Sequence, residues 1–117
     1  MLIQGDVRRI AKKFGVDPAL IQAVVVAEGN IIRAVQCSIP TVTTREAALE
    51  VTCRSAAHAM SDFIVSDLAR ARSFVEFWGK RWAPEGADND PTALNANWPN
   101  NVKHLWIPVH TKFDAKA

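Results

Sequence analysis

The sequence lacks several features on which whole classes of protein depend. Its 14 Lys and Arg residues exceed its 12 Asp and Glu residues by only two, and they are spread along the chain instead of gathered in one run. A nucleic-acid binder usually carries a concentrated basic patch, so this charge pattern disfavours that class. The longest apolar run, residues 23–27, is far shorter than the ~20 residues that cross a bilayer, so we expect no membrane insertion. The first residues, MLIQGDVRRI, lack the basic and then apolar segments of a signal peptide, and we expect none.

Cysteine is also scarce. Cys37 and Cys53 show no CxxC spacing and have no nearby histidine arranged as a zinc ligand set, so we expect no metal and no cofactor. Two reduced thiols and one disulfide both fit the sequence. Cys53 lies on the apolar face of a predicted helix and should be buried, whereas Cys37 precedes a loop and should be more accessible.

Apolar residues recur at helical spacing, and no stretch alternates convincingly at period two. With 117 residues, 49% of them hydrophobic, the chain is sized for one domain over residues 1–117. The predicted class is therefore a single compact all-α domain. Caps and periodicity predict helices over residues 6–14, 17–28, 43–65 and 73–83, a helical end and loop over 30–40, a long ordered Asn- and Pro-rich loop with one short helical turn over 84–101, and a last short helix over 100–106.

Two capping boxes mark predicted helix starts. Thr43 precedes Glu46 by three residues, and Ser73 precedes Glu76 by the same spacing. The face predicted to be buried behind the first box consists of Leu49, Cys53, Ala56, Met60 and Phe63. An aromatic stripe follows the second box, formed by Phe74, Phe77, Trp78 and Trp82. We interpret Trp78 and Trp82 as core residues.

The stretch FGVDPALIQAVVVAEGN, residues 14–30, fits two interpretations. A glycine turn followed by a helix is typical of a helix-turn-helix DNA-binding motif, but of the outward positions only Gln22 is able to read a base edge. Alternatively, Asp17 and Pro18 begin a helix that is apolar all round and therefore buried. In that case its one charged residue, Glu28, is carried to the edge of an apolar interior.

Glu28 is the residue on which a catalytic hypothesis depends. Partial burial beside Gly29 disfavours the charged form of a carboxyl group, which is the condition for a general acid near neutral pH. The alternative is a solvated residue at a helix C-terminus. A negative charge there opposes the helix dipole at a cost of roughly 0.3–1 kcal/mol, so the placement requires a compensating interaction.

Two segments carry a family resemblance. GVDPALIQAVVVAEG resembles the first segment of soluble lytic transglycosylases and related lysozyme-like domains, and FVEFWGKRWAPEGADNDPTALNANWPNNV resembles the closing segment of phage and prophage members of that group. Here Gly29 stands where the family usually has serine, and the family's Gly-Leu-Met-Gln cleft segment is absent. Gln36 is our candidate to replace the glutamine of that segment.

The resemblance implies a lysozyme-like fold of phage or prophage type and cleavage of the peptidoglycan glycan strand. It also implies that Glu28 first protonates the leaving glycosidic oxygen and then takes a proton from the 6-hydroxyl of the sugar, giving a 1,6-anhydro product. The protein would act at the bacterial cell wall, reached from a virion or from the host cytoplasm. Because Asn and Trp side chains suit glycan recognition, the predicted substrate-binding residues are Gln36, Asn89, Asn95, Asn97 and Trp98.

Other interpretations stay open. If a water molecule were the nucleophile, Asp62, Asp88 or Asp90 would position it. A non-catalytic virion or tail component that binds glycan and other phage proteins is the principal alternative, and the helix-turn-helix module is the third. His58, His104 and His110 have no serine or cysteine in a nucleophile context, so we interpret them as structural or surface residues.

Overall fold

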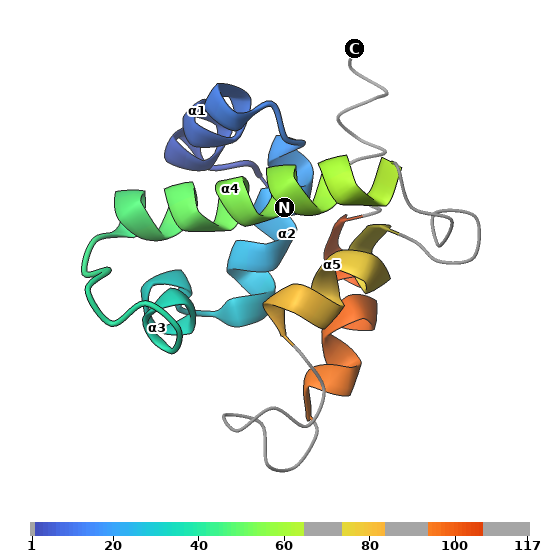
Figure 1. Ribbon diagram of the computed structural model, residues 1–117. Coiled ribbons are helices and arrows are strands. Elements are labelled where there is room, and N and C mark those ends of the chain that lie inside the picture. The colour runs from blue at the N-terminus through green and yellow to red at the C-terminus, as the bar shows by residue number, and fades with distance from the viewer. Residues whose placement is uncertain (1, 65–73, 84–93, 107–117) are drawn as a thin grey trace.

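The computed structural model describes residues 2–64, 74–83 and 94–106, and every regular element within these ranges is a helix. This confirms the all-α class. The elements are α1 (Gly5–Phe14), α2 (Pro18–Glu28), α3 (Ile31–Gln36), α4 (Arg45–Ile64), α5 (Phe74–Trp82), the short 3₁₀ helix η2 (Leu94–Asn97) and a helix over residues 98–106. The long helix α4 crosses the molecule and contacts α1, α3 and α5, while α2 passes behind it (Figure 1). No described helix is both long and apolar enough to cross a membrane.

Local signals set the bounds of α2 as the sequence predicts. The Asp17 carboxylate accepts a hydrogen bond from the Ala19 amide at 2.9 Å, and Pro18 fills the first helical position, where its missing N–H costs nothing. Gly29 ends the helix with φ at 74°, a conformation that L side chains rarely adopt. All residues from Ala19 to Val25 are buried, which confirms the predicted core helix.

The cap of α4 differs from the prediction by one residue. The helix begins at Arg45, and the hydroxyl of Thr44 accepts a hydrogen bond from the Ala47 amide at 3.2 Å, so the predicted Thr43 capping box is wrong. Glu46 instead forms an ion pair with Arg9 of α1 at 2.8 Å. The predicted apolar face is otherwise placed well, because Leu49, Cys53 and Ala56 are buried; Met60, near the end of the helix, is 39% exposed.

A polar network joins the N-terminal segment to α2 and α4. The Arg45 guanidinium donates to Asp6 at 2.6 Å and to the Gln4 side chain at 2.5 Å. Gln22 of α2 is only 3% exposed, and its amide accepts a bond from the Gln4 backbone and donates one to the Gln4 side chain. The residue that the helix-turn-helix interpretation assigns to a base edge is therefore used inside the fold.

Aromatic packing centres on Trp78 of α5, which has no exposed surface, so its predicted core role is confirmed. Its ring stacks on Phe74 at 5.9 Å between centroids and meets Trp98 edge to face at 5.6 Å. Its indole N–H donates to the Ser55 hydroxyl at 2.9 Å. A buried indole requires such an acceptor, and this bond fixes α5 against α4.

The last part of the predicted loop over residues 84–101 is helical. Residues 84–93 lie outside the described part of the chain, as does Ser73 of the second capping box, but residues 94–97 form η2 and residues 98–106 are α-helical. The last helix thus begins two residues before the predicted start at Asn100. Pro99 does not prevent this, because a proline is tolerated in the first turn of a helix.

Candidate functional site

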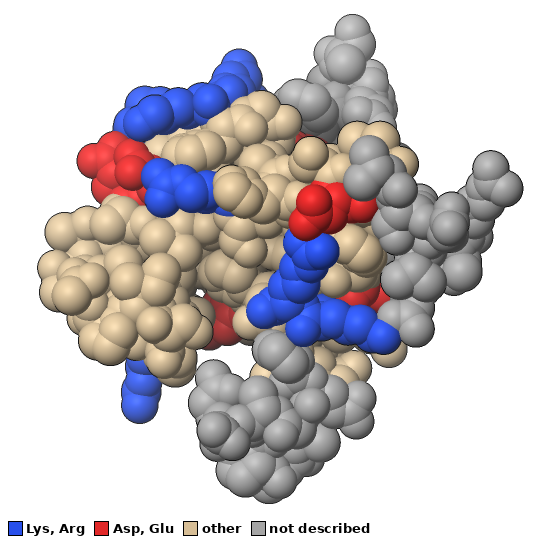
Figure 2. Space-filling view, in the orientation of Figure 1, with Lys and Arg blue, Asp and Glu red and all other residues tan. Residues whose placement is uncertain are grey.

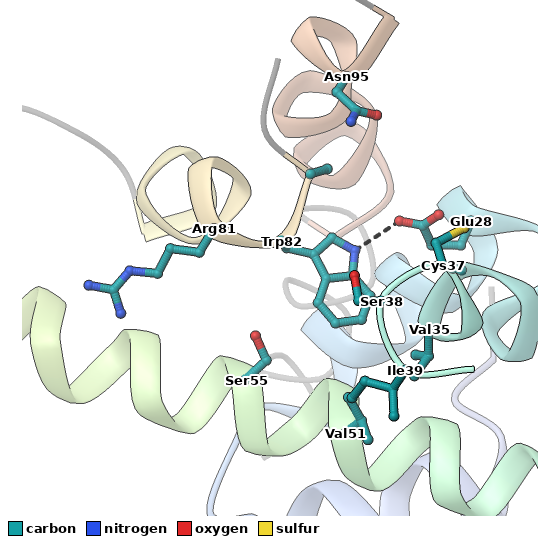
Figure 3. Close-up of a pocket in the computed structure, with 12 residues that line it drawn as sticks. Glu28, Val35, Cys37, Ser38, Ile39, Val51, Ser55, Arg81, Trp82 and Asn95 are labelled. Carbon is teal, nitrogen blue, oxygen red and sulfur yellow. Dashed lines mark hydrogen bonds between the residues drawn. The ribbon is translucent and has the colours of Figure 1, made fainter. Parts of the chain in front are cut away.

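Glu28 lies at the C-terminal end of α2 and is half-buried. Its carboxylate oxygen Oε1 accepts two hydrogen bonds, from the indole Nε1 of Trp82 and from that of Trp98, each at 2.9 Å. Figure 3 shows the first of these bonds. The donors come from α5 and from the helix over residues 98–106. They supply the compensating interaction that an acidic residue at a helix C-terminus requires.

The two oxygens of the Glu28 carboxyl group differ in their hydrogen bonds. A carboxylate oxygen has about two acceptor sites, and both sites of Oε1 are used. No hydrogen bond from the described residues reaches Oε2. A proton that Glu28 gives or takes is therefore carried by Oε2, while Oε1 holds the group in a fixed orientation.

A pocket of about 260 Å³ adjoins this carboxyl group. Four parts of the fold contribute to it: the end of α2, the segment around the end of α3, one face of α4, and α5 with η2 (Figure 3). Its lining combines apolar side chains with hydroxyl, amide and guanidinium groups. The lining residues are Glu28, Ala34, Val35, Cys37, Ser38, Ile39, Val51, Ser55, Arg81, Trp82, Ala83 and Asn95.

The pocket is one part of a longer depression. A neighbouring pocket of about 400 Å³ shares Ala83 and Asn95 with it, and another of about 360 Å³ shares four of its residues on α4, α5 and the segment after α3. The surface is hollowed beneath α4, between the α3 segment and α5, with Lys and Arg atoms on the α5 side (Figure 2). An elongated ligand, more than a small compact one, fits this shape.

The predicted substrate-binding residues do not all lie at the Glu28 pocket. Asn95 lines the Glu28 pocket. Gln36 does not line it, although its neighbours Val35 and Cys37 do. Asn97 is exposed on η2 outside this lining, and Asn89 falls outside the described residues.

Trp98 has a different position from the one expected. It is only 7% exposed and packs on α5, so its ring is not a platform for a sugar; its contact with the site is the bond to Glu28. Gly79 makes this packing possible, because a Cβ there would lie 3.0 Å from the Trp98 ring. Trp82, which the aromatic stripe assigns to the core, is half-buried and lines the pocket. The sequence context of each indole is misleading, since Trp98 stands among Asn and Pro residues and Trp82 ends an aromatic stripe.

Among the described residues, Glu28 is the one acid that lines its pocket. Asp62 forms an ion pair with Arg81 at 2.6 Å and does not line the pocket. Asp88 and Asp90, the other candidates for positioning a water molecule, lie outside the described residues. The described site therefore offers one carboxyl group for proton transfer.

Both cysteines are free thiols, Cys37 exposed at the pocket and Cys53 buried in the core. Burial, with a smaller contribution from the Glu50 charge, raises the pKa of Cys53 to about 12, so this thiol stays protonated at neutral pH. His58 and His104 are exposed, and His110 lies outside the described residues. In the described ranges no cluster of His, Cys, Asp and Glu has an arrangement that would hold a metal ion.

Comparison of the chain with protein-family models, with curated proteins and with solved structures found no match.

Proposed function

We propose that this protein cleaves the glycan strand of peptidoglycan, with Glu28 acting first as general acid and then as general base. The observation that supports this most strongly is the setting of the Glu28 carboxyl group. Two indole N–H groups hold one oxygen, and the other oxygen is left for proton transfer beside an open pocket. A positioned carboxyl group of this kind suits general acid and base catalysis.

The proposed reaction uses one proton-transfer group twice. Oε2 of Glu28 donates its proton to the glycosidic oxygen as the bond from that oxygen to C1 breaks. The carboxylate then takes the proton of the 6-hydroxyl while the 6-oxygen forms a bond to C1. The products are a strand with a new free hydroxyl and a 1,6-anhydro sugar, and Glu28 regains its proton without consumption of water.

The single described carboxyl group favours this route over hydrolysis. Glycosidases that use water or a covalent intermediate generally need two carboxyl groups about 5–9.5 Å apart. Asp62 pairs with Arg81 and is not part of the pocket lining. The remaining lining suits a sugar, because Trp82 offers an aromatic ring and Asn95 offers amide donor and acceptor groups.

A non-catalytic glycan-binding virion component is the second candidate. It is favoured by the same two indole bonds, because they give Glu28 a structural role that joins α2 to α5 and to the last helix. A fold could keep Glu28 for this reason alone. No comparable observation favours the DNA-binding candidate, since α2 is buried over most of its length and Gln22 is bonded to Gln4.

The experiment is digestion of purified peptidoglycan by the native protein, Glu28→Gln and a control, Glu46→Gln, at an exposed position on α4. Products are identified by mass spectrometry. We expect anhydro-muropeptides from the native protein and the control, and a release rate lower by on the order of 10²–10⁴ for Glu28→Gln. Reducing ends would instead indicate hydrolysis. An active Glu28→Gln protein would remove the catalytic assignment, and a folded native protein that releases nothing would favour the non-catalytic candidate.

A further inference from the structure

The solvent-facing side of α1 carries a basic patch. It combines exposed Lys and Arg side chains of α1 with one of α4, and its members are Arg8, Arg9, Lys12, Lys13 and Arg54. The α4 member adjoins the others at the Phe14 ring, since the Arg54 guanidinium lies 5.5 Å from the centre of that ring and the Lys13 ammonium group lies 5.7 Å from it. Figure 2 shows Lys and Arg atoms along the edge of the molecule that α1 forms in Figure 1. The fold thus concentrates basic groups on one face, although the formal net charge of the whole chain is only +2.

Nearby acidic groups neutralise only part of this patch. Glu46 and Glu50 of α4 each form one ion pair with a basic residue of α1, at 2.8 and 3.5 Å. Within the described ranges no ion pair reaches the other three members, Arg8, Lys12 and Arg54. Five basic and two acidic side chains therefore leave an excess of three positive charges on this face.

The stability of α1 accounts for only some of these charges. Lys12 and Lys13 lie in the last turn of the helix, where a positive charge interacts favourably with the helix dipole. This reason does not apply to Arg8, which lies one turn earlier. Arg8 and Lys12 are four residues apart on the helix surface, and like charges at that spacing destabilise a helix. An anionic partner would relieve this repulsion.

The shape and chemistry of the patch fit a flat anionic surface. None of the three pockets described above includes a residue of α1, so the patch offers no groove for a single polymer strand. The exposed positions of α1 carry no Asn, Gln or Ser that would read a base edge. The apolar residues Val7, Ile10 and Ala11 have no exposed surface, so the folded helix has no apolar side to insert into a bilayer.

We propose that the basic patch on α1 docks the protein, without insertion, on a lipid bilayer that contains anionic headgroups. A basic residue near such a surface contributes about fivefold in affinity. An excess of three charges therefore gives a preference for anionic over zwitterionic bilayers on the order of 100-fold. In Figure 1, α1 lies on the opposite side of α4 from α3 and α5, which contribute to the Glu28 pocket. The docked protein would thus keep this pocket open to solvent.

The experiment measures co-sedimentation of the full chain with vesicles of phosphatidylglycerol and phosphatidylcholine, and with vesicles of phosphatidylcholine alone. One variant, Arg8→Gln/Lys12→Gln, removes two charges of the patch. The control, Arg33→Gln/Lys80→Gln, removes two exposed charges from α3 and α5, so the two variants have the same net charge. Thermal unfolding confirms that each protein is folded. The vesicles contain no glycan, so the result is independent of the proposed function.

We expect the patch variant to bind the anionic vesicles about 10- to 30-fold more weakly than the native protein, and the control to stay within about twofold. Raising the salt concentration from about 0.1 M to about 1 M should abolish the preference, because the Debye length falls from about 10 Å to about 3 Å. Equal losses in the two variants would show that net charge governs binding, and would overturn the inference. Equal binding of the native protein to both kinds of vesicle would do the same, as would tighter binding to duplex DNA or to soluble poly(glycerol phosphate) at the same phosphate concentration.

Discussion

Replacing Glu28 by alanine should destabilise the protein, whereas replacing it by glutamine should not. Alanine removes the acceptor of two indole N–H groups, those of Trp82 and Trp98. Glutamine keeps a side-chain oxygen at the position of Oε1, so both bonds remain. The pair of substitutions therefore separates the structural role of this side chain from its proposed role in proton transfer.

The expected size follows from the burial of the two donors. Trp98 is 7% exposed, so water cannot replace its lost acceptor, and one buried unsatisfied donor costs about 1–3 kcal/mol. Trp82 is half-buried, and water can satisfy its N–H in part. Removing a negative charge from the C-terminus of α2 stabilises the fold by roughly 0.3–1 kcal/mol, because that charge opposes the helix dipole. The net loss for Glu28→Ala is then about 1–3 kcal/mol, and Glu28→Gln should stay within ~1 kcal/mol of the native protein.

Thermal and urea unfolding followed by tryptophan fluorescence would measure both changes. At about 4 °C per kcal/mol for a domain of this size, Glu28→Ala should lower Tm by roughly 4–12 °C. If Glu28→Ala unfolded at the native Tm, the indole bonds would contribute nothing and the argument for an oriented carboxyl group would fail. If Glu28→Gln lost as much stability as Glu28→Ala, the charge would matter more than the acceptor.

Three other regions give independent tests. A maleimide should label Cys37 on the native protein and reach Cys53 only after unfolding, because Cys53 is buried with a pKa of about 12; mass spectrometry showing two rapid labels would contradict this. Gly79→Ala would place a methyl group 3.0 Å from the Trp98 ring and should lower the free energy of unfolding in urea by ~1–3 kcal/mol. An unchanged free energy of unfolding would show that the ring moves aside freely. The hydrogen bond and the charge of Arg45 hold the pKa of Asp6 below 3.8. The contribution of Asp6 to stability is therefore present above pH 3.8 and lost as the pH falls below it. Asp6→Asn should flatten the dependence of Tm on pH in that range, and an unchanged slope would show that the pair contributes little.

Local signals made parts of this fold predictable from the sequence. The bounds of α2 follow from an N-cap, a proline at the first helical position and a glycine at the end, all of which act within a few residues. The Thr43 prediction failed because Thr43 and Thr44 are both good caps, and the choice between them depends on how α4 packs on α1, where Glu46 pairs with Arg9. A capping motif therefore locates the start of a helix to within a residue or two, but it does not identify the N-cap residue itself.

The candidate site was predictable at its acid and at Asn95, which lines the same pocket, but not at its indole groups. Glu28 stands out as the one charge at the end of an apolar helix, but its donors lie 54 and 70 residues away in the chain. Periodicity shows that an indole ring will be buried; it does not show which acceptor its N–H will find. The aromatic stripe assigned Trp82 to the core, and the Asn- and Pro-rich stretch assigned Trp98 to the ligand, but the structure places Trp82 at the pocket and buries Trp98.

The tryptophans of the last helix also explain how a distant segment can fix the position of Glu28. Trp98 donates to Glu28 at one end of α2, and Trp106 donates to the Asp17 cap at the other end, at 3.0 Å. The helix rises about 12 Å between the two indoles, and α2 rises about 16 Å between the two carboxylates, so the long indole side chains span the remaining difference. The two helices are thus bonded at both ends. A change anywhere in residues 98–106 that shifts the last helix would move the Glu28 carboxyl group, because Trp98 holds its Oε1.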